Sequence, residues 1–161
     1  MEKHAETSRL FLKLMTIEDY QFIKTLVNTE GWITFIGDRK VITDEDSKNY
    51  IQKILDNKNV NYWVVTLKSD LTPIGVVTLI KRDTLEFQDL GFAFLPEFGK
   101  NGYAFESADF LLNQLKSNQT ISAITNPDNG KSATLLEKLG FIFKEETVIN
   151  DEALLVYLKV I

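Results

Sequence analysis

Two glycines, Gly99 and Gly102, lie in a polar stretch, PEFGKNGYAFES, that separates two apolar runs. The run before them, LGFAFL at residues 90–95, has the composition of a strand, and the run after them repeats apolar residues at helical spacing. A strand that enters a helix through a glycine-rich turn exposes free N–H groups at the helix N-terminus, where the helix dipole also favours anions. Glycine also lets a phosphate approach the backbone without an intervening Cβ. The stretch therefore indicates either a phosphate-binding turn or a plain strand–helix connection.

The two best-known phosphate motifs do not fit this stretch. A P-loop reads GxxxxGKS or GxxxxGKT, and the letters GKNGYAFES lack the final Lys-Ser/Thr pair. A dinucleotide fingerprint needs GxGxxG early in the chain, and the sequence contains none. If this turn binds a phosphate, it does so through a different motif.

A second stretch with chemical potential is ITNPDNGKSATLLEKLGF, residues 124–141. Asn129 and Ser132 stand at the start of a segment with helical spacing, and Gly140 suits the position after its end. Both polar residues have a simple structural role, Asn129 as a helix cap and Ser132 in the first turn. The same side chains could instead contact a ligand, and one residue could do both.

The elements that would position these residues follow from periodicity and from cap and turn residues. Thr16 and the letters TDED mark two helix starts, and short polar turns separate three consecutive apolar strands into a meander. The segment NTEGWITFIGDRK, residues 28–40, is expected to be a loop with a short apolar insertion. The predicted strands are Arg9–Leu14, Val60–Leu67, Ile74–Ile80, Leu85–Leu95, Ile121–Thr125, Phe141–Glu146 and Ala153–Val160, and the predicted helices are Glu18–Val27, Thr43–Leu55, one from near Gly102, and Ser132–Leu139. Their order, β-α-α-β-β-β-α-β-α-β-β, predicts an α/β fold with a mixed sheet and a right-handed crossover after Leu95.

Composition restricts the class of protein. With 161 residues and 44% hydrophobic content, the chain fits one domain with a real core, residues 1–161. The absence of cysteine excludes disulfides, thiolate metal sites and a cysteine nucleophile. A net charge of −5 argues against nucleic acid as a partner. The N-terminus is polar, and no apolar stretch approaches the roughly 20 residues that span a bilayer, so we expect a cytoplasmic protein without a membrane partner.

The two stretches together resemble the GNAT superfamily of N-acetyltransferases, most closely the ribosomal-protein N-terminal (alanine) acetyltransferase-like branch. PEFGKNGYAFES is similar to that branch's PEYWGKGYATEA, and PDNGKSATLLEKLGF is similar to PxNxxSxxLLEKLGF. GWITFIGDR and PIGVVTLIKRD are also similar, so the resemblance runs from about residue 10 to 157. The second motif is the more specific, because four residues match its spacing together: Asn129, Ser132, Gly140 and Phe141.

The resemblance implies a single-domain α/β fold. Its mixed, mostly antiparallel sheet would have about seven strands, splayed between the fourth and the fifth, with about four helices. It also implies an enzyme that moves an acetyl group from acetyl-CoA to a primary amine, on a peptide or a small molecule, by direct transfer in a ternary complex. The alternative is a GNAT-like domain that binds an acyl-CoA or a partner protein without catalysis. No metal is implied, and the assembly would be a monomer or a homodimer.

The family's cofactor motif, Gln/Arg-x-x-Gly-x-Gly/Ala, falls on residues 99–104. Gly102 and Ala104 match it, whereas Gly99 replaces the long first residue and Lys100 replaces a frequent glycine. By resemblance, the pyrophosphate would lie on the amides of Gly99, Lys100, Asn101, Gly102, Tyr103 and Ala104. The pantetheine arm would pair like an extra strand with Phe92, Ala93, Phe94 and Leu95. Asn129 would hydrogen-bond the pantetheine, and Ser132 would face the sulfur.

The catalytic and acceptor residues are open to two interpretations each. Asp89 and Glu86 are predicted on the strand where GNAT enzymes often keep a carboxylate that acts through water, although a solvated strand face is equally consistent with them. The family's frequent tyrosine acid is replaced here by Leu136, so that role is unavailable at this position. By resemblance, the Ser132 hydroxyl would face the sulfur and would assist proton donation rather than decide it. Acceptor-binding candidates are Glu30, Trp32, Phe35 and Asp38, of which the aromatics are also ordinary core residues. The single histidine, His4, is not expected to be catalytic.

Overall fold

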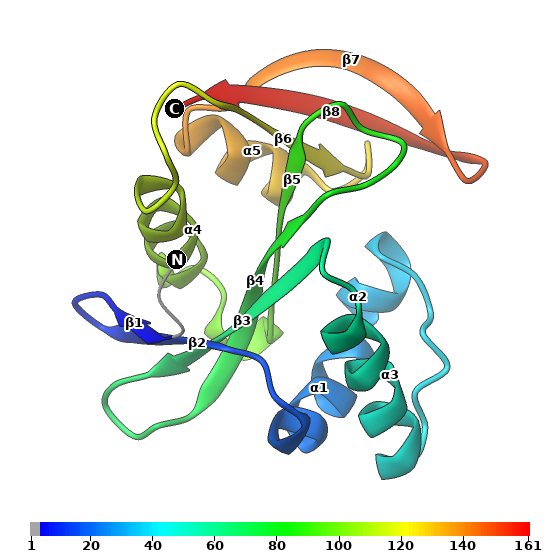
Figure 1. Cartoon of the computed structure of the whole chain (residues 1–161), viewed down its shortest axis with the longest axis vertical. Coiled ribbons are helices and arrows are strands. Elements are labelled where there is room, and N and C mark those ends of the chain that lie inside the picture. The colour runs from blue at the N-terminus through cyan, green and yellow to red at the C-terminus, as the bar shows by residue number, and fades with distance from the viewer. Residues whose placement is uncertain (1–3) are drawn as a thin grey trace.

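The computed structural model describes residues 4–161, and within them one mixed sheet runs through the whole molecule (Figure 1). The sheet has eight strands in the order β1-β2-β3-β4-β5-β6-β8-β7. The first five strands pair antiparallel, β5 and β6 are parallel, and the last strands are antiparallel again. The strand bounds are β1 His4–Glu6, β2 Leu10–Leu14, β3 Val60–Leu67, β4 Pro73–Ile80, β5 Gln88–Phe94, β6 Thr120–Thr125, β7 Ile142–Ile149 and β8 Glu152–Val160.

The sheet opens between β5 and β6. Only two residue pairs join these strands, Gln88 with Ile121 and Asp89 with Ser122, both at the starts of the strands. Beyond them, β5 remains paired with β4 alone and β6 with β8 alone. The two strands therefore form a gap that opens toward their carboxyl ends.

Five α-helices pack on the two faces of this sheet. Figure 1 shows α1, α2 and α3 grouped on one side and α4 on the other. One core joins the sheet to α4 and α5, with Leu90, Leu111 and Leu136 among its buried members, and a second joins it to α1–α3. The helix bounds are α1 Tyr20–Val27, α2 Glu30–Phe35, α3 Asp44–Asp56, α4 Tyr103–Asn113 and α5 Gly130–Lys138, with short 3-10 turns at Ile17–Asp19 and Pro96–Phe98.

The helix caps explain why these helices start where they do. Thr43 caps α3 through its side-chain oxygen, and Asp46 bonds back to the Thr43 backbone, which makes a complete capping box. Thr16 and Asp19 make a similar box at the 3-10 turn before α1. At the end of α5, Gly140 takes the left-handed conformation, with φ 84°, that favours glycine after a helix. The predictions for Thr43 and Gly140 are confirmed, whereas Thr16 caps the 3-10 turn and Asp19 is the N-cap of α1.

The predicted α/β fold with a mixed, mostly antiparallel and splayed sheet is confirmed, with small differences in count. The N-terminal segment around His4 contributes a short edge strand, β1, so the splay lies between the fifth and sixth strands. Residues 28–40 are not simply a loop, because Thr29 accepts a hydrogen bond from the Trp32 N–H and starts helix α2. In residues 4–161, no helix has the length and apolar character needed to cross a membrane.

Candidate active site

The N-terminus of α4 presents backbone N–H groups without a side-chain cap. Gly102 is its N-cap residue and offers no side chain to accept from these groups. The first regular helix hydrogen bond is donated by the Glu106 N–H to the Gly102 carbonyl at 2.9 Å. The N–H groups of the three preceding residues therefore make no hydrogen bond within the helix. The dipole of the helix makes this end favourable for an anion.

The conformation of the turn explains its glycine. Gly102 has φ 79°, in the left-handed region, and Lys100 has φ 64° although it is not a glycine. A Cβ built on Gly102 would point toward Arg9, 3.5 Å from its Nη2 atom, rather than into open space. Gly102 is therefore required for its backbone conformation. At Gly99, the N–H already donates to the Pro96 carbonyl at 3.1 Å, so this amide is used within the turn.

One edge of β5 is open beside the gap. Residues from Gly75 to Thr78 of β4 pair with Phe94 through Gly91 of β5, so one edge is satisfied. The other edge of β5 beyond Asp89 has no strand partner in the described part of the chain. Phe92, Ala93 and Phe94 are partly exposed there. An extended, amide-bearing ligand can pair with such an edge as an added strand does.

Asn129 and Ser132 lie just after the carboxyl end of β6. The Asn129 Oδ1 atom accepts the Ser132 backbone N–H at 3.2 Å, which confirms the capping role. This cap uses only the carbonyl oxygen of the Asn129 side chain and the backbone of Ser132. The Asn129 amide group and the Ser132 hydroxyl take no part in it, and both residues are half-buried. Because β5 and β6 are parallel, this cap and the α4 turn lie at the same end of the gap.

Asp89 lies at the vertex of the gap, in the last pair that joins β5 to β6. The residue is 1% exposed, and its Oδ2 atom accepts a hydrogen bond from Arg82 Nε at 2.8 Å. The Oδ1 atom is also buried, and no hydrogen-bond partner satisfies it in residues 4–161. Burial raises the pKa of Asp89 to about 6, against the opposing effect of the Arg82 guanidinium.

Glu86 does not share this position. The strand begins at Gln88, so Glu86 precedes it in the bend that follows β4, and its side chain is exposed. The prediction that both carboxylates lie on the strand is wrong for Glu86. Its backbone carbonyl accepts a hydrogen bond from Lys81, which fixes the bend. Of the two carboxylates, the structure brings only Asp89 to the splay.

The four predicted acceptor residues lie on α2 and the segment after it. Glu30 is exposed, and Phe35 is partly buried. Trp32 is 5% exposed and packs in the core between the sheet and α1–α3, where its Nε1 atom has no hydrogen-bond partner within residues 4–161. Asp38 forms a 2.8 Å ion pair with Lys40, whose hydrogen bonds hold the pKa of Asp38 below its ordinary value.

Two arginines near the site were absent from the sequence prediction. Arg82 forms an ion pair with Asp89 across the β4–β5 hairpin. Opposite charges on the two sides of a predicted hairpin could have indicated this pair from the sequence. Arg9, the residue before β2, contacts the α4 turn, and its guanidinium donates to the Asn101 carbonyl at 3.0 Å. No local pattern predicts the second contact, because the two residues are 92 positions apart.

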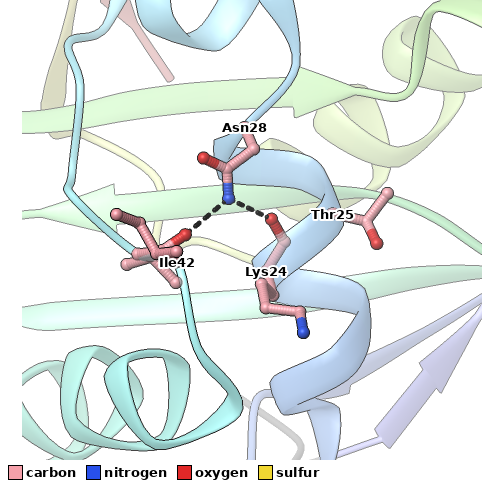
Figure 2. A pocket seen from close by; sticks show the side chains of 5 residues that line it. Lys24, Thr25, Asn28 and Ile42 are labelled. Atoms are coloured by element: carbon pink, nitrogen blue, oxygen red, sulfur yellow. Dashed lines mark hydrogen bonds between the residues drawn. The ribbon is translucent and has the colours of Figure 1, made fainter.

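A surface hollow of about 310 Å³ lies elsewhere, beside α1. Figure 2 shows Asn28 at its centre, donating one hydrogen bond to the Lys24 carbonyl, and the same amide also donates to the Val41 carbonyl, each at 2.7 Å. None of β5, β6, α4 and α5 contributes to this hollow. Asn28 ties the end of α1 to the segment before α3, which is a structural role. No cluster of three or more potential metal ligands occurs among the residues that the structure describes.

The sequence and the fold of the chain are similar to those of known proteins. Residues 9–142 match the acetyltransferase (GNAT) domain family. The chain is 26% identical over 142 residues to the uncharacterised N-acetyltransferase YnaD of Bacillus subtilis, covering 85% of this chain and 81% of that one. Its fold matches that of the ribosomal-protein-S5-alanine acetyltransferase of Vibrio fischeri, with a TM-score of 0.79 at 20% identity over 99% and 97% of the two chains.

A further structural match is RimL, a ribosomal L7/L12 alpha-N-protein acetyltransferase solved in complex with coenzyme A. The TM-score is 0.80 at 13% identity, over 96% of each chain. The family match spans most of the chain, including the turn at Gly99–Ala104 and the cap at Asn129. The chain therefore belongs to the acetyltransferase (GNAT) domain family and is an N-acetyltransferase.

Proposed function

We propose that the chain transfers an acetyl group from acetyl-CoA directly to a primary amine in a ternary complex. The observation that supports this most is the gap between β5 and β6. At its open end lies the uncapped N-terminus of α4, and at its closed end lies the buried carboxylate of Asp89. A long ligand fits this arrangement if its anionic end lies at the start of α4 and its reactive end lies near Asp89.

The residues present suit acetyl-CoA along the whole gap. The free amides at the start of α4, next to the exposed Lys100, would hold the pyrophosphate. The Gly99 amide is excluded from this set because it is bonded to Pro96. The open edge of β5 over Phe92–Phe94 would pair with the pantetheine amides, and the Asn129 side-chain amide would donate to the same arm. Acetyl-CoA itself supplies the activated thioester.

The chain's own groups define the proton path. An amine nitrogen must be neutral to attack, which is easier for an α-amino group with a pKa of about 7.7–8.0 than for a lysine at about 10.4. In the proposed step, the amine nitrogen forms a bond to the acetyl carbon while the carbon–sulfur bond breaks. The amine proton passes through a water to Asp89, and the leaving thiolate takes a proton from solvent or from the Ser132 hydroxyl. The lack of cysteine excludes a thioester on a cysteine side chain.

The acceptor is proposed only as a primary amine. The names of two structural neighbours refer to ribosomal-protein acetylation, which makes a protein N-terminus the first class to test. Polyamines, amino sugars and small metabolite amines form the comparison classes. The exposed carboxylate of Glu30 on α2 is consistent with a cationic acceptor on that side.

The test is a turnover assay with acetyl-CoA and one amine of each class, in which free thiol release is measured. Amine-dependent thiol release would support the proposal, and the best class would identify the acceptor. Binding of CoA without turnover of any class would instead support the alternative of a non-catalytic acyl-CoA-binding domain. Thiol release before amine addition, or a trapped acetyl-protein, would contradict direct transfer.

A further inference from the structure

The segment before β2 contacts the first turn of α4 through an ion-pair network. Both side-chain oxygens of Glu106 are engaged by it. The Oε1 atom accepts from Thr7 Oγ1 at 2.5 Å and from the Arg9 backbone N–H at 3.0 Å, and the Oε2 atom accepts from Arg9 Nε at 2.7 Å. Burial alone would raise the pKa of Glu106, but these donors outweigh it and hold the pKa below its ordinary value. Glu106 is thus an ionised partner of Arg9 at neutral pH.

The same guanidinium also reaches the turn that precedes α4. Its Nη1 atom donates to the Asn101 carbonyl at 3.0 Å, and its carbon centre lies 4.5 Å from the centroid of the Tyr103 ring. The Nη2 atom faces Gly102, which lies between these two residues. One side chain therefore contacts Asn101 and Tyr103, the residues on either side of Gly102.

The turn needs such support because its backbone is strained. Lys100 takes a left-handed φ of 64°, which is unfavourable for a residue with a Cβ, whereas Gly102 takes φ 79° without strain because it has no Cβ. Asn101, whose carbonyl Arg9 holds, is the residue between them. A conformation of this kind persists only when surrounding contacts determine it.

Charge gives Arg9 a second effect. Glu106 lies in the first turn of α4, where its negative charge would compete with a phosphate for the positive end of the helix dipole. The Arg9 guanidinium neutralises that charge at 2.7 Å. Removal of Arg9 alone would leave an unpaired carboxylate beside the anion site.

We propose that Arg9 and Glu106 are positioning residues that hold the turn at residues 99–104 in the shape that receives the pyrophosphate of acetyl-CoA. This inference rests on the proposed function. In this proposal, the segment just before β2 supports the turn. The first residue of the turn, Gly99, has no side chain that could do so. We call Thr7, Arg9 and Glu106 the clamp. Because neither Arg9 nor Glu106 lies in the strands that border the gap, we expect the acetyl-transfer step itself not to depend on the clamp.

The experiment compares two donors, acetyl-CoA and acetyl-pantetheine, because the second has no pyrophosphate. Arg9→Met, which keeps the stem of the side chain, Glu106→Gln and the double variant are assayed with both donors. Arg9→Lys keeps the charge but loses the forked contacts. Lys68→Met is the matched control, because Lys68 pairs with Glu6 at 2.9 Å on the neighbouring β1 and makes no contact with the turn.

The clamp predicts that Arg9→Met raises KM for acetyl-CoA about tenfold or more, with kcat and KM for acetyl-pantetheine within about twofold of the parent protein. Glu106→Gln should have a smaller effect, and the double variant should bind acetyl-CoA better than Arg9→Met, because the unpaired charge is gone. Arg9→Lys should be intermediate, and Lys68→Met should not change either donor's KM.

Several outcomes would overturn the clamp. An unchanged KM for acetyl-CoA in folded Arg9→Met is one, and an equal rise for both donors is another, since it would indicate general damage. If Arg9→Met does not fold, Arg9→Lys and Glu106→Gln give the same comparison, and parental KM values in both would refute the clamp. If the parent protein does not bind acetyl-CoA, the proposed function and the clamp are both refuted. If the parent protein transfers the acetyl group and the variants keep its KM for acetyl-CoA, only the clamp is refuted.

Discussion

At the residue scale, the proposed role of Asp89 as a base depends on how its carboxylate is buried. Its carboxylate lies almost fully out of solvent, with one oxygen paired to Arg82 and the other without a partner in residues 4–161. A buried polar atom without a partner is costly, so a water or a substrate group is needed to satisfy it. The raised pKa, about 6, keeps the group ionised at neutral pH while leaving it more basic than an exposed aspartate.

If Asp89 is the base, the pH dependence of catalysis follows from its pKa. The carboxylate must be deprotonated to accept the amine proton, so kcat/KM should fall as the pH decreases through about 6. Asp89→Asn should lower kcat by roughly 10²- to 10⁴-fold and should remove this inflection. Steady-state rates from pH 5 to 8, with CoA affinity as the control for folding, provide the measurement. A variant with parental rates would exclude Asp89 as the base.

At the scale of elements, the turn that precedes α4 depends on a glycine in the left-handed conformation. Gly102→Val should lower CoA affinity by at least about tenfold, because a β-branched residue is strained at φ 79° and would reshape the turn. Gly31→Ala is the matched control, since Gly31 lies in α2 and nothing lies within 4 Å of its added Cβ. Calorimetric titration with CoA measures both variants. Parental affinity in folded Gly102→Val would remove the turn from the site.

Helix α2 carries the predicted acceptor side and leads to a second prediction. The charge of Glu30 is exposed, whereas that of Asp38 is compensated by Lys40. Glu30→Gln should therefore raise KM for a cationic acceptor by about 2- to 5-fold, and Asp38→Asn should raise it less. Neither should change CoA affinity. Loss of CoA affinity with an unchanged acceptor KM would show that α2 does not border the acceptor.

In the whole molecule, the two parts of the sheet are joined by very little backbone pairing. Two residue pairs connect β5 to β6, so the relation between the strands depends on the core beneath α4 and α5. Leu136 of α5 is 1% exposed in that core. The position that resembles the family's tyrosine acid is therefore filled here by a packing residue.

Truncation of this core should destabilise the protein as a unit. Leu136→Ala should reduce the free energy of unfolding by roughly 2–5 kcal/mol, because it leaves a cavity in a closely packed interior. Urea unfolding followed by circular dichroism measures the change, with the exposed Leu71→Ala as a comparison that should stay within about 0.5 kcal/mol. If the free energy of unfolding falls by less than about 1 kcal/mol, as for a surface substitution, the core does not depend on α5.

Much of the fold could be predicted from the sequence because its signals are local. The β3 prediction, Val60–Leu67, is confirmed to the residue, and the caps at Thr43 and Asn129 act within three positions of themselves. Helix α2 was not predicted, because six residues are too few for a helical period to be visible and only Trp32 among them is buried. The glycine turn and the Asn129 cap were recognisable from letters alone, as parts of motifs that belong to one family.

The sequence by itself determined the order of the elements other than β1 and α2, the turn at Gly102 and the absence of cysteine chemistry, because each depends on neighbouring residues or on composition. Only the tertiary structure decided which carboxylate lies at the splay, what Trp32 packs against, and which side chain contacts the turn. Asp89 and Glu86 are three positions apart, yet one is buried against Arg82 and the other is exposed. Arg9 meets Glu106 across 97 positions of chain. Burial and long-range pairing depend on how distant segments pack, and no local pattern carries that information.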